Sequence, residues 1–238
     1  HASYEERIFE QLCGRGYMTY DFFTPGLIIH AIDTHCPDKL VGWANEIVQK
    51  GLRTVNMLGC HDGIPLLDLK GLLAEDEIQS LIDRIVARGG HVKDLHGQKS
   101  VYYQVNATYF SALGEDEKKL LFARALQMFM PGKPQVWYLD LFAGVNDHEA
   151  VLRAGEGGHK EINRTNLSMD EVRARLRLPV VQEQLRLLRY RNSCLAFGFN
   201  SALTVSQDGE VTCFTWDNGA HRTTLRANFA TYDYEISD

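Results

Sequence analysis

The chain has 238 residues, of which 45% are hydrophobic, and it carries a formal net charge of −6. This composition supports a large domain with a sizeable buried core and excludes a disordered chain. The acidic balance argues against a nucleic-acid or anionic-membrane partner. Five scattered cysteines without a C-x-x-C pair are typical of a reducing, cytoplasmic compartment, not of a disulfide framework or a zinc site.

The first half of the chain alternates predicted helices and strands. The sequence predicts an amphipathic helix over 3–14, capped by Ser3, and a short strand that turns into a helix over 17–32. A further helix over 38–51 leads into a buried strand over 53–60. The order is typical of βαβ units.

The second half continues this alternation and then changes character. Helices are predicted over 74–90, 115–130 and 179–192, and an apolar strand is predicted over 131–144. Residues 202–237 alternate apolar and polar side chains around two Gly-containing turns, which indicates antiparallel strands.

The predicted fold class is therefore α/β with a mainly parallel sheet, followed by a small antiparallel β domain. We place the boundary between residues 192 and 193. In a parallel α/β barrel, the loops after the strands share one face, where chemistry gathers. Two polar loops follow predicted strands here, one at His61-Asp62 and one over 140–149, so we expect a shared site.

His61 and Asp62 are weak evidence when taken alone, because an Asp in a loop often bonds local backbone amides. The alternative is a carboxylate that stabilises the positive charge of an oxocarbenium-like transition state. Other site types fit worse. The segment 155–164 lacks the P-loop spacing, no G-x-S-x-G elbow exists, and no ligand cluster implies a metal or another cofactor.

Several long motifs, however, carry a specific resemblance. The segments CHDGIPLLDLKGLL, YYQVNATYFSALG, ARALQMFMPGKPQVWYLDLFAGVND and INR, followed by PVVQEQLRLLRYRN, resemble the sucrose phosphorylase subfamily of the α-amylase superfamily. They occur in that family's order and spacing over effectively the whole chain. Among the members of this subfamily, the chain looks closest to the glucosylglycerate phosphorylases.

The resemblance implies a fold and a set of residue roles. The fold is the C-terminal part of a (β/α)8 TIM barrel over 1–192, with an inserted subdomain over about 65–113, and a β domain over 193–238. Such enzymes move an α-glucosyl group between an acceptor and inorganic phosphate with retention. By this match, Asp62 is similar to the transition-state-stabilising Asp and His61 to the histidine that bonds the sugar hydroxyls. Tyr103 and Gln104 match a mobile acceptor-side loop, and Lys160 falls where sucrose phosphorylases carry an Arg.

Two family residues have no counterpart in the sequence. The nucleophilic Asp of the R-x-D type and the acid/base Glu both belong to the part of the family's barrel that precedes this chain's match. We therefore expect the 238 residues alone to be inactive and to need the N-terminal half of the barrel as a partner. A non-catalytic carbohydrate-binding barrel is the alternative, and a homodimer remains open.

The acceptor is predicted from the cations near the motifs. His91, Lys93, His96 and Lys99 lie close to Gln104 in sequence, and Lys160 adds a further cation. Charge-assisted bonds favour an anionic acceptor. We therefore expect D-glycerate as the acceptor, with fructose 6-phosphate, fructose and glycerol as alternatives. The cations have a second explanation, because inorganic phosphate, a substrate of every member of the subfamily, would also need them.

Overall fold

A three-stranded parallel sheet lies at the centre of the computed structural model, which describes residues 4–94 and 102–238, with side chains for 4–92 and 104–238. Its strands, in the order β1-β2-β6, are β1 Thr19–Asp21, β2 Thr54–Asn56 and β6 Lys133–Pro134. Thr19 pairs with Thr54, and Val55 pairs with Lys133. Within the described ranges, the outer edges of β1 and β6 pair with no further strand.

Helices cover this sheet as the alternating pattern predicts. They are α1 Thr24–Thr34, α2 Asp38–Gln49, α5 Glu117–Phe129 and α9 Pro179–Ser193. The start of α5 is set by Asp116, whose side chain accepts from the backbone N–H groups of Lys118 and Lys119. α9 begins with Pro179, which fits the first helical turn because its missing N–H has no partner there.

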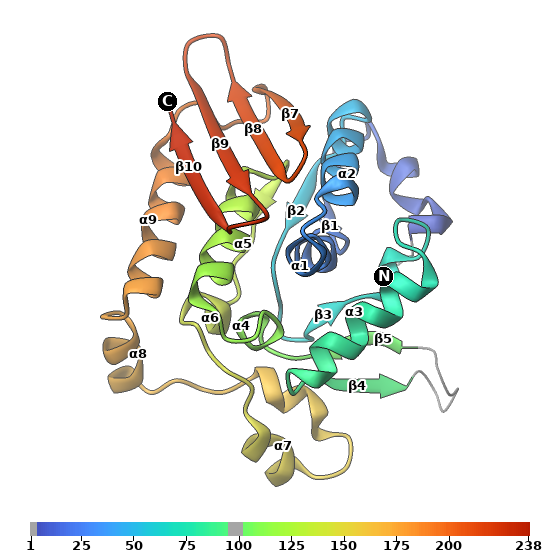
Figure 1. The fold of residues 1–238 in the computed structure, drawn as a ribbon, viewed down its shortest axis with the longest axis vertical. Coiled ribbons are helices and arrows are strands. Elements are labelled where there is room, and N and C mark those ends of the chain that lie inside the picture. Colours follow the sequence, from blue (N-terminus) through green and yellow to red (C-terminus); the bar gives the residue numbers. More distant parts are fainter. Residues whose placement is uncertain (1–3, 95–101) are drawn as a thin grey trace.

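The segment between β2 and α5 forms a separate antiparallel layer. Its strands, in the order β3-β5-β4, are β3 Ile64–Pro65, β4 His91–Asp94 and β5 Tyr102–Asn106. The helices around it are α3 Glu75–Ala87, α4 Tyr109–Ala112 and a 3-10 turn at Leu67–Leu69. In Figure 1 this layer lies at the lower right, with α3 beside it.

A four-stranded antiparallel sheet lies at the opposite end of the molecule (Figure 1). Its strands are β7 Ala202–Asp208, β8 Val211–Asp217, β9 Arg222–Asn228 and β10 Asp233–Ser237, in the order β10-β9-β8-β7. Phe214 and Trp216 alternate with more exposed residues along β8, as the predicted period of two requires. Trp216 Nε1 donates to Phe129 O at 2.9 Å, which ties this sheet to the end of α5.

Two predicted elements differ from the structure. The helix expected over 3–14 is instead two 3-10 turns, Tyr4–Glu6 and Ile8–Leu12, separated by Arg7 with φ 54°. Tertiary contacts set this break, because Arg7 pairs with Glu46 at 3.2 Å while Tyr4 and Phe9 pack edge-on against Trp43 of α2.

The second difference lies after β6. The strand expected over 131–144 ends at Pro134, and Tyr138–Leu141 forms the short helix α6. The remaining chain before α9 contains α7 His148–Ala154, a 3-10 segment at Gly158–Asn163 and α8 Met169–Arg175. α7 projects at the lower end of Figure 1. The described ranges contain no helix with the length and hydropathy needed to cross a bilayer.

Candidate functional site

The His61-Asp62 pair lies in a tight turn just beyond β2. Gly63 N donates to Cys60 O at 3.0 Å and Asp62 N donates to Cys60 Sγ at 3.4 Å. Gly63 has φ 100°, and a Cβ at this position would lie 2.4 Å from Val105 O. Only glycine fits this close approach without displacing β5. The turn therefore holds the two side chains at the end of the strand.

Two buried amides of β5 fix the backbone of this turn. Gln104 Nε2 and Asn106 Nδ2 each donate to Asp62 O at 2.7 Å. The resemblance matched Gln104 to a mobile acceptor-side loop, but in the structure Gln104 lies in β5 and is 3% exposed, and its amide nitrogen binds the backbone of Asp62. The side chains of Lys93 and Tyr103, and the whole of His96 and Lys99, lie outside the described residues.

Three positively charged or titratable side chains surround the Asp62 carboxylate. Lys160 Nζ lies 2.6 Å from Oδ1, Arg164 Nη2 lies 3.2 Å from the same oxygen, and His61 Nε2 lies 3.3 Å from Oδ2. Burial would raise the pKa of Asp62, but the hydrogen bond and charge of Lys160, with the charges of His61 and Arg164, outweigh it and lower the pKa below its ordinary value. Asp62 is therefore held ionised.

Arg164 and Asn163 are site residues that the sequence analysis quoted within the INR motif but gave no role. Arg164 Nε donates to His61 O at 3.0 Å while its Nη2 reaches Asp62, so one guanidinium holds both residues of the turn. Asn163 Nδ2 donates to Cys60 O and accepts at Oδ1 from Trp137 Nε1, 3.2 Å away. The only sequence signal for a role of these two residues was that the INR motif follows Lys160 closely in the chain.

The site is open to solvent on the histidine side. The side chain of His61 is 60% exposed and that of Asp62 is 31% exposed. The His61 ring lies 6.0 Å from the Trp137 ring, so an aromatic wall stands beside the imidazole. An ionised carboxylate, an exposed imidazole and an aromatic ring are a suitable set of groups for a sugar ring that develops positive charge. In residues 4–94 and 102–238, no cluster of three His, Cys, Asp or Glu side chains forms a candidate metal site.

Replacing Lys160 by methionine is expected to raise the pKa of Asp62 toward its ordinary value, because the nearest cation is lost. The effect on the free energy of unfolding should stay below ~1 kcal/mol, since both side chains are about one-third exposed. Carboxyl-carbon NMR titration of Asp62 measures the shift. Lys118→Met, which removes an exposed lysine paired with Asp233 at 2.7 Å, is the matched control and should leave Asp62 unchanged.

Asp140 is a buried carboxylate in α6, the short helix that follows β6. It is 1% exposed, and its Oδ1 accepts from Tyr109 N at 3.0 Å. Burial raises the pKa of Asp140 to about 6, although the charge of buried Arg124 and backbone N–H groups lower it in part. Asp140 therefore ties α6 to the start of α4, and no bond from it to Asp62 is present in the described structure.

We compared the chain with families and proteins that are already known. No family model matches the chain. A sucrose 6(F)-phosphate phosphorylase of Ilumatobacter coccineus is 50% identical over 246 residues, which cover 100% of this chain and 47% of that protein. A glucosylglycerate phosphorylase of Escherichia coli is 30% identical over 79% of this chain and 36% of its own length.

A solved structure agrees with this match. The crystal structure of sucrose 6F-phosphate phosphorylase from Thermoanaerobacter thermosaccharolyticum superposes with a TM-score of 0.89 at 34% identity, over 99% of this chain and 48% of that one. The chain thus spans about half the length of the curated relatives it matches. The predicted fold class, the C-terminal part of a TIM barrel with an insertion and a terminal β domain, is confirmed. An α-amylase structure from H. orenii, 14% identical over 93% of this chain and 42% of that one, shares the fold with a TM-score of 0.57. The chain belongs to the sucrose phosphorylase family.

Proposed function

We propose that this chain forms the C-terminal half of a retaining α-glucosyl phosphorylase. The observation that carries the proposal is the Asp62 carboxylate, held ionised by Lys160 and Arg164 at the end of a parallel barrel strand. The carboxyl ends of barrel strands are where catalytic groups of such folds gather. In this role Asp62 stabilises the transition state and His61 bonds the sugar hydroxyls.

The remaining half of the barrel must supply two further carboxylates. A retaining enzyme needs a nucleophile and an acid/base residue about 5–5.5 Å apart across the scissile bond. The acid protonates the leaving oxygen as the nucleophile forms a glucosyl-enzyme, and phosphate then attacks the anomeric carbon to give α-glucose 1-phosphate. Asp62 stabilises the positive charge that develops at the anomeric carbon in the transition states of both steps. Alone, this chain is expected to have no turnover.

We propose an anionic acceptor, with fructose 6-phosphate as the first candidate. Lys160 and Arg164 place two cations beside Asp62, and charged donors bind phosphate and carboxylate groups strongly. Two relatives, 50% and 34% identical over 100% and 99% of this chain, are named for sucrose 6(F)-phosphate. D-glycerate, the first expectation from the basic sequence pattern, becomes the second candidate, and neutral fructose is the third.

The test uses a completed enzyme, defined as this chain preceded in one polypeptide by the N-terminal half of the Ilumatobacter relative. Phosphate release from α-glucose 1-phosphate is measured with fructose 6-phosphate, D-glycerate and D-fructose, with the 238-residue chain as the inactive control. We expect release with fructose 6-phosphate to be fastest. Release with glycerate alone would reassign the acceptor.

The same assay can overturn the proposed reaction as a whole. If a completed enzyme that folds cooperatively released no phosphate with any of the three acceptors, the proposal that it is a phosphorylase would be contradicted. A non-catalytic carbohydrate-binding barrel would then be the remaining interpretation, and glucose binding measured by calorimetry would support it.

A further inference from the structure

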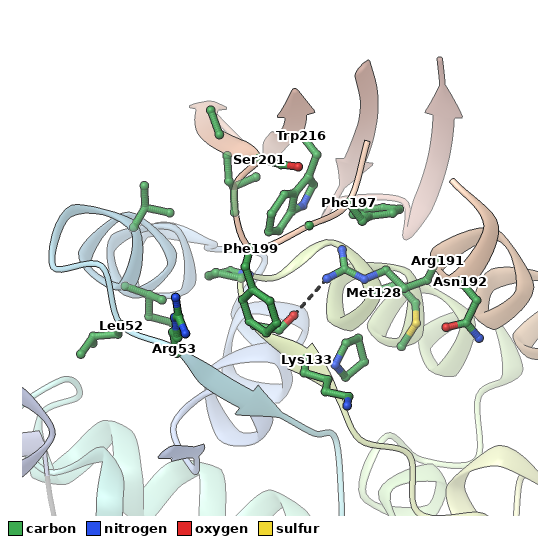
Figure 2. A pocket seen from close by; sticks show the side chains of 18 of the residues that line it. Leu52, Arg53, Met128, Lys133, Arg191, Asn192, Phe197, Phe199, Ser201 and Trp216 are labelled. Atoms are coloured by element: carbon green, nitrogen blue, oxygen red, sulfur yellow. Dashed lines mark hydrogen bonds between the residues drawn. The ribbon is translucent and has the colours of Figure 1, made fainter. Parts of the chain in front are cut away.

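A large groove lies between the parallel sheet and the terminal β sheet (Figure 2). Its lining residues include none of those at the Asp62 site. Its volume is about 710 Å³. Its wall is formed in part by β6, by the end of α9, and by the linker over 197–201 with the first residues of β7. Phe197, Phe199 and Trp216 form its aromatic part, and Phe199 is 64% exposed although it is large and apolar.

Three cations line this groove without an acidic residue among its lining side chains. They are Arg53, Lys133 and Arg191, and none of them forms an ion pair with a carboxylate in the described part of the chain. Arg53 lies over the Phe199 ring, with 5.4 Å from its guanidinium carbon to the ring centroid. The groove therefore combines apolar surface with uncompensated positive charge.

Arg191 has a fixed place in the wall. Its Nη2 donates to Gly132 O at 3.0 Å, and its guanidinium stacks 3.9 Å from the Phe197 centroid. Its Nη1 is buried without a hydrogen-bond partner among the described residues. A buried donor that lacks a partner carries a free-energy cost, which an added acceptor would relieve.

The groove also adjoins an unfinished edge of the barrel sheet. Lys133 and Pro134 line it and together constitute β6, whose outer edge has no partner strand within the described ranges. At the other edge of the sheet, Tyr20 of β1 exposes 54% of its surface, and Tyr17, which precedes β1, exposes 64%. A closed barrel leaves no such edge, because its first and last strands pair.

We propose that this groove is the docking site for the barrel-completing half, and that it receives a segment with an apolar side chain flanked by a carboxylate. The apolar group covers Phe199, and the carboxylate lies between Arg53 and Lys133. This inference rests on the proposed function. The adjacent open edge of β6 favours a polypeptide over a small anion, because a strand that pairs with β6 brings its own flanking residues to the groove.

The first test measures complex formation between two separate, co-expressed polypeptides, this chain and the N-terminal half of the Ilumatobacter relative. The double variant Arg53→Gln/Lys133→Gln should weaken the complex at least about tenfold in a dilution series, because two charges that become buried on docking are lost. Both side chains are exposed, so the variant should fold, whereas Arg191 is left intact because it holds Gly132.

The matched control removes two other exposed arginines, in Arg153→Gln/Arg173→Gln, at 67% and 66% exposure on α7 and α8. It changes the net charge equally and should leave the complex intact. Equal weakening in both double variants, or no weakening in either, would overturn the docking site. The completed enzyme could still release phosphate, so the two proposals fail separately.

A cross-linking experiment identifies the occupant. A photoreactive benzophenone side chain at position 199 should couple to the N-terminal half, at an acidic and apolar segment found by mass spectrometry. The same group at position 152, where Leu152 is 80% exposed on α7, should not couple. Absence of coupling at 199 would count against docking. Calorimetric binding of inorganic phosphate to the isolated chain, lost in Arg53→Gln/Lys133→Gln, would identify a small-anion pocket instead and overturn the proposal.

Discussion

Replacing Asp62 by asparagine in the completed enzyme is expected to lower phosphate release from α-glucose 1-phosphate by about 10²–10³-fold. Removing one preorganised electrostatic group at a transition state typically costs this much. The asparagine keeps the shape of the side chain and the backbone bonds from Gln104 and Asn106, which end on Asp62 O. The loss of activity would therefore result from the missing charge and not from a change in the conformation of the turn.

The loss should appear in kcat more than in KM, because in the proposed role Asp62 acts on a positive charge that exists only in the transition state. Asp170→Asn is the matched control, since it also replaces a carboxylate that lies 2.8 Å from an arginine, here on the surface of α8. That variant should keep full activity. If Asp62→Asn also retained activity within about threefold, Asp62 would be only a loop cap.

The sequence predicted the parts of this site that depend on local signals. The apolar residues over 53–60 predicted a strand before His61-Asp62, and the helices predicted over 115–130 and 179–192 are α5 and α9, with Pro179 at the start of α9. These features arise from backbone preferences within a few residues. The resemblance singled out Lys160 because it falls where sucrose phosphorylases carry an Arg. In the structure Lys160 contacts Asp62, which lies 98 positions earlier in the chain.

Other features depended on contacts between distant segments. Arg164 bonds to His61 and Asp62 from 103 and 102 positions away, so no local pattern could give it a role. The helix expected over 3–14 is broken because the aromatic residues there pack on α2, and such tertiary contacts override helix propensity. The groove at β6 likewise forms only where α9, the linker and the sheet meet. The domain boundary at 192/193 stays a prediction, although α9 ends at Ser193 and β7 begins at Ala202.

Asp140 gives the second large expected effect, on stability as a function of pH. Burial raises its pKa from 3.8 to about 6, so between these values the folded state binds a proton that the unfolded state has released. Folding stability therefore falls as the pH rises through this window, and the penalty is complete above the folded pKa. The variant Asp140→Asn carries an uncharged amide at this position, which cannot titrate.

The measurement is the free energy of unfolding of the 238-residue chain and of its Asp140→Asn variant, by urea denaturation. Between about pH 4.5 and about pH 7.5, the stability of the wild type relative to the variant should fall by roughly 2 kcal/mol. The comparison cancels the titration of all other groups to first order. The variant also places an amide nitrogen where a carboxyl oxygen stands, which changes its stability by an amount that does not depend on the protonation of Asp140. The test is therefore the slope of the stability difference with pH, and not its absolute value.

Asp62→Asn supplies a control of opposite sign. The pKa of Asp62 is lowered in the fold, so its ionised form contributes stability above the unfolded pKa that is lost as the pH falls. Relative to that variant, the wild type should gain stability as the pH rises, by a smaller amount because Asp62 is partly exposed. Slopes of the same sign in both comparisons would contradict the assignment of Asp140 as a buried structural carboxylate and Asp62 as the ionised group of the site.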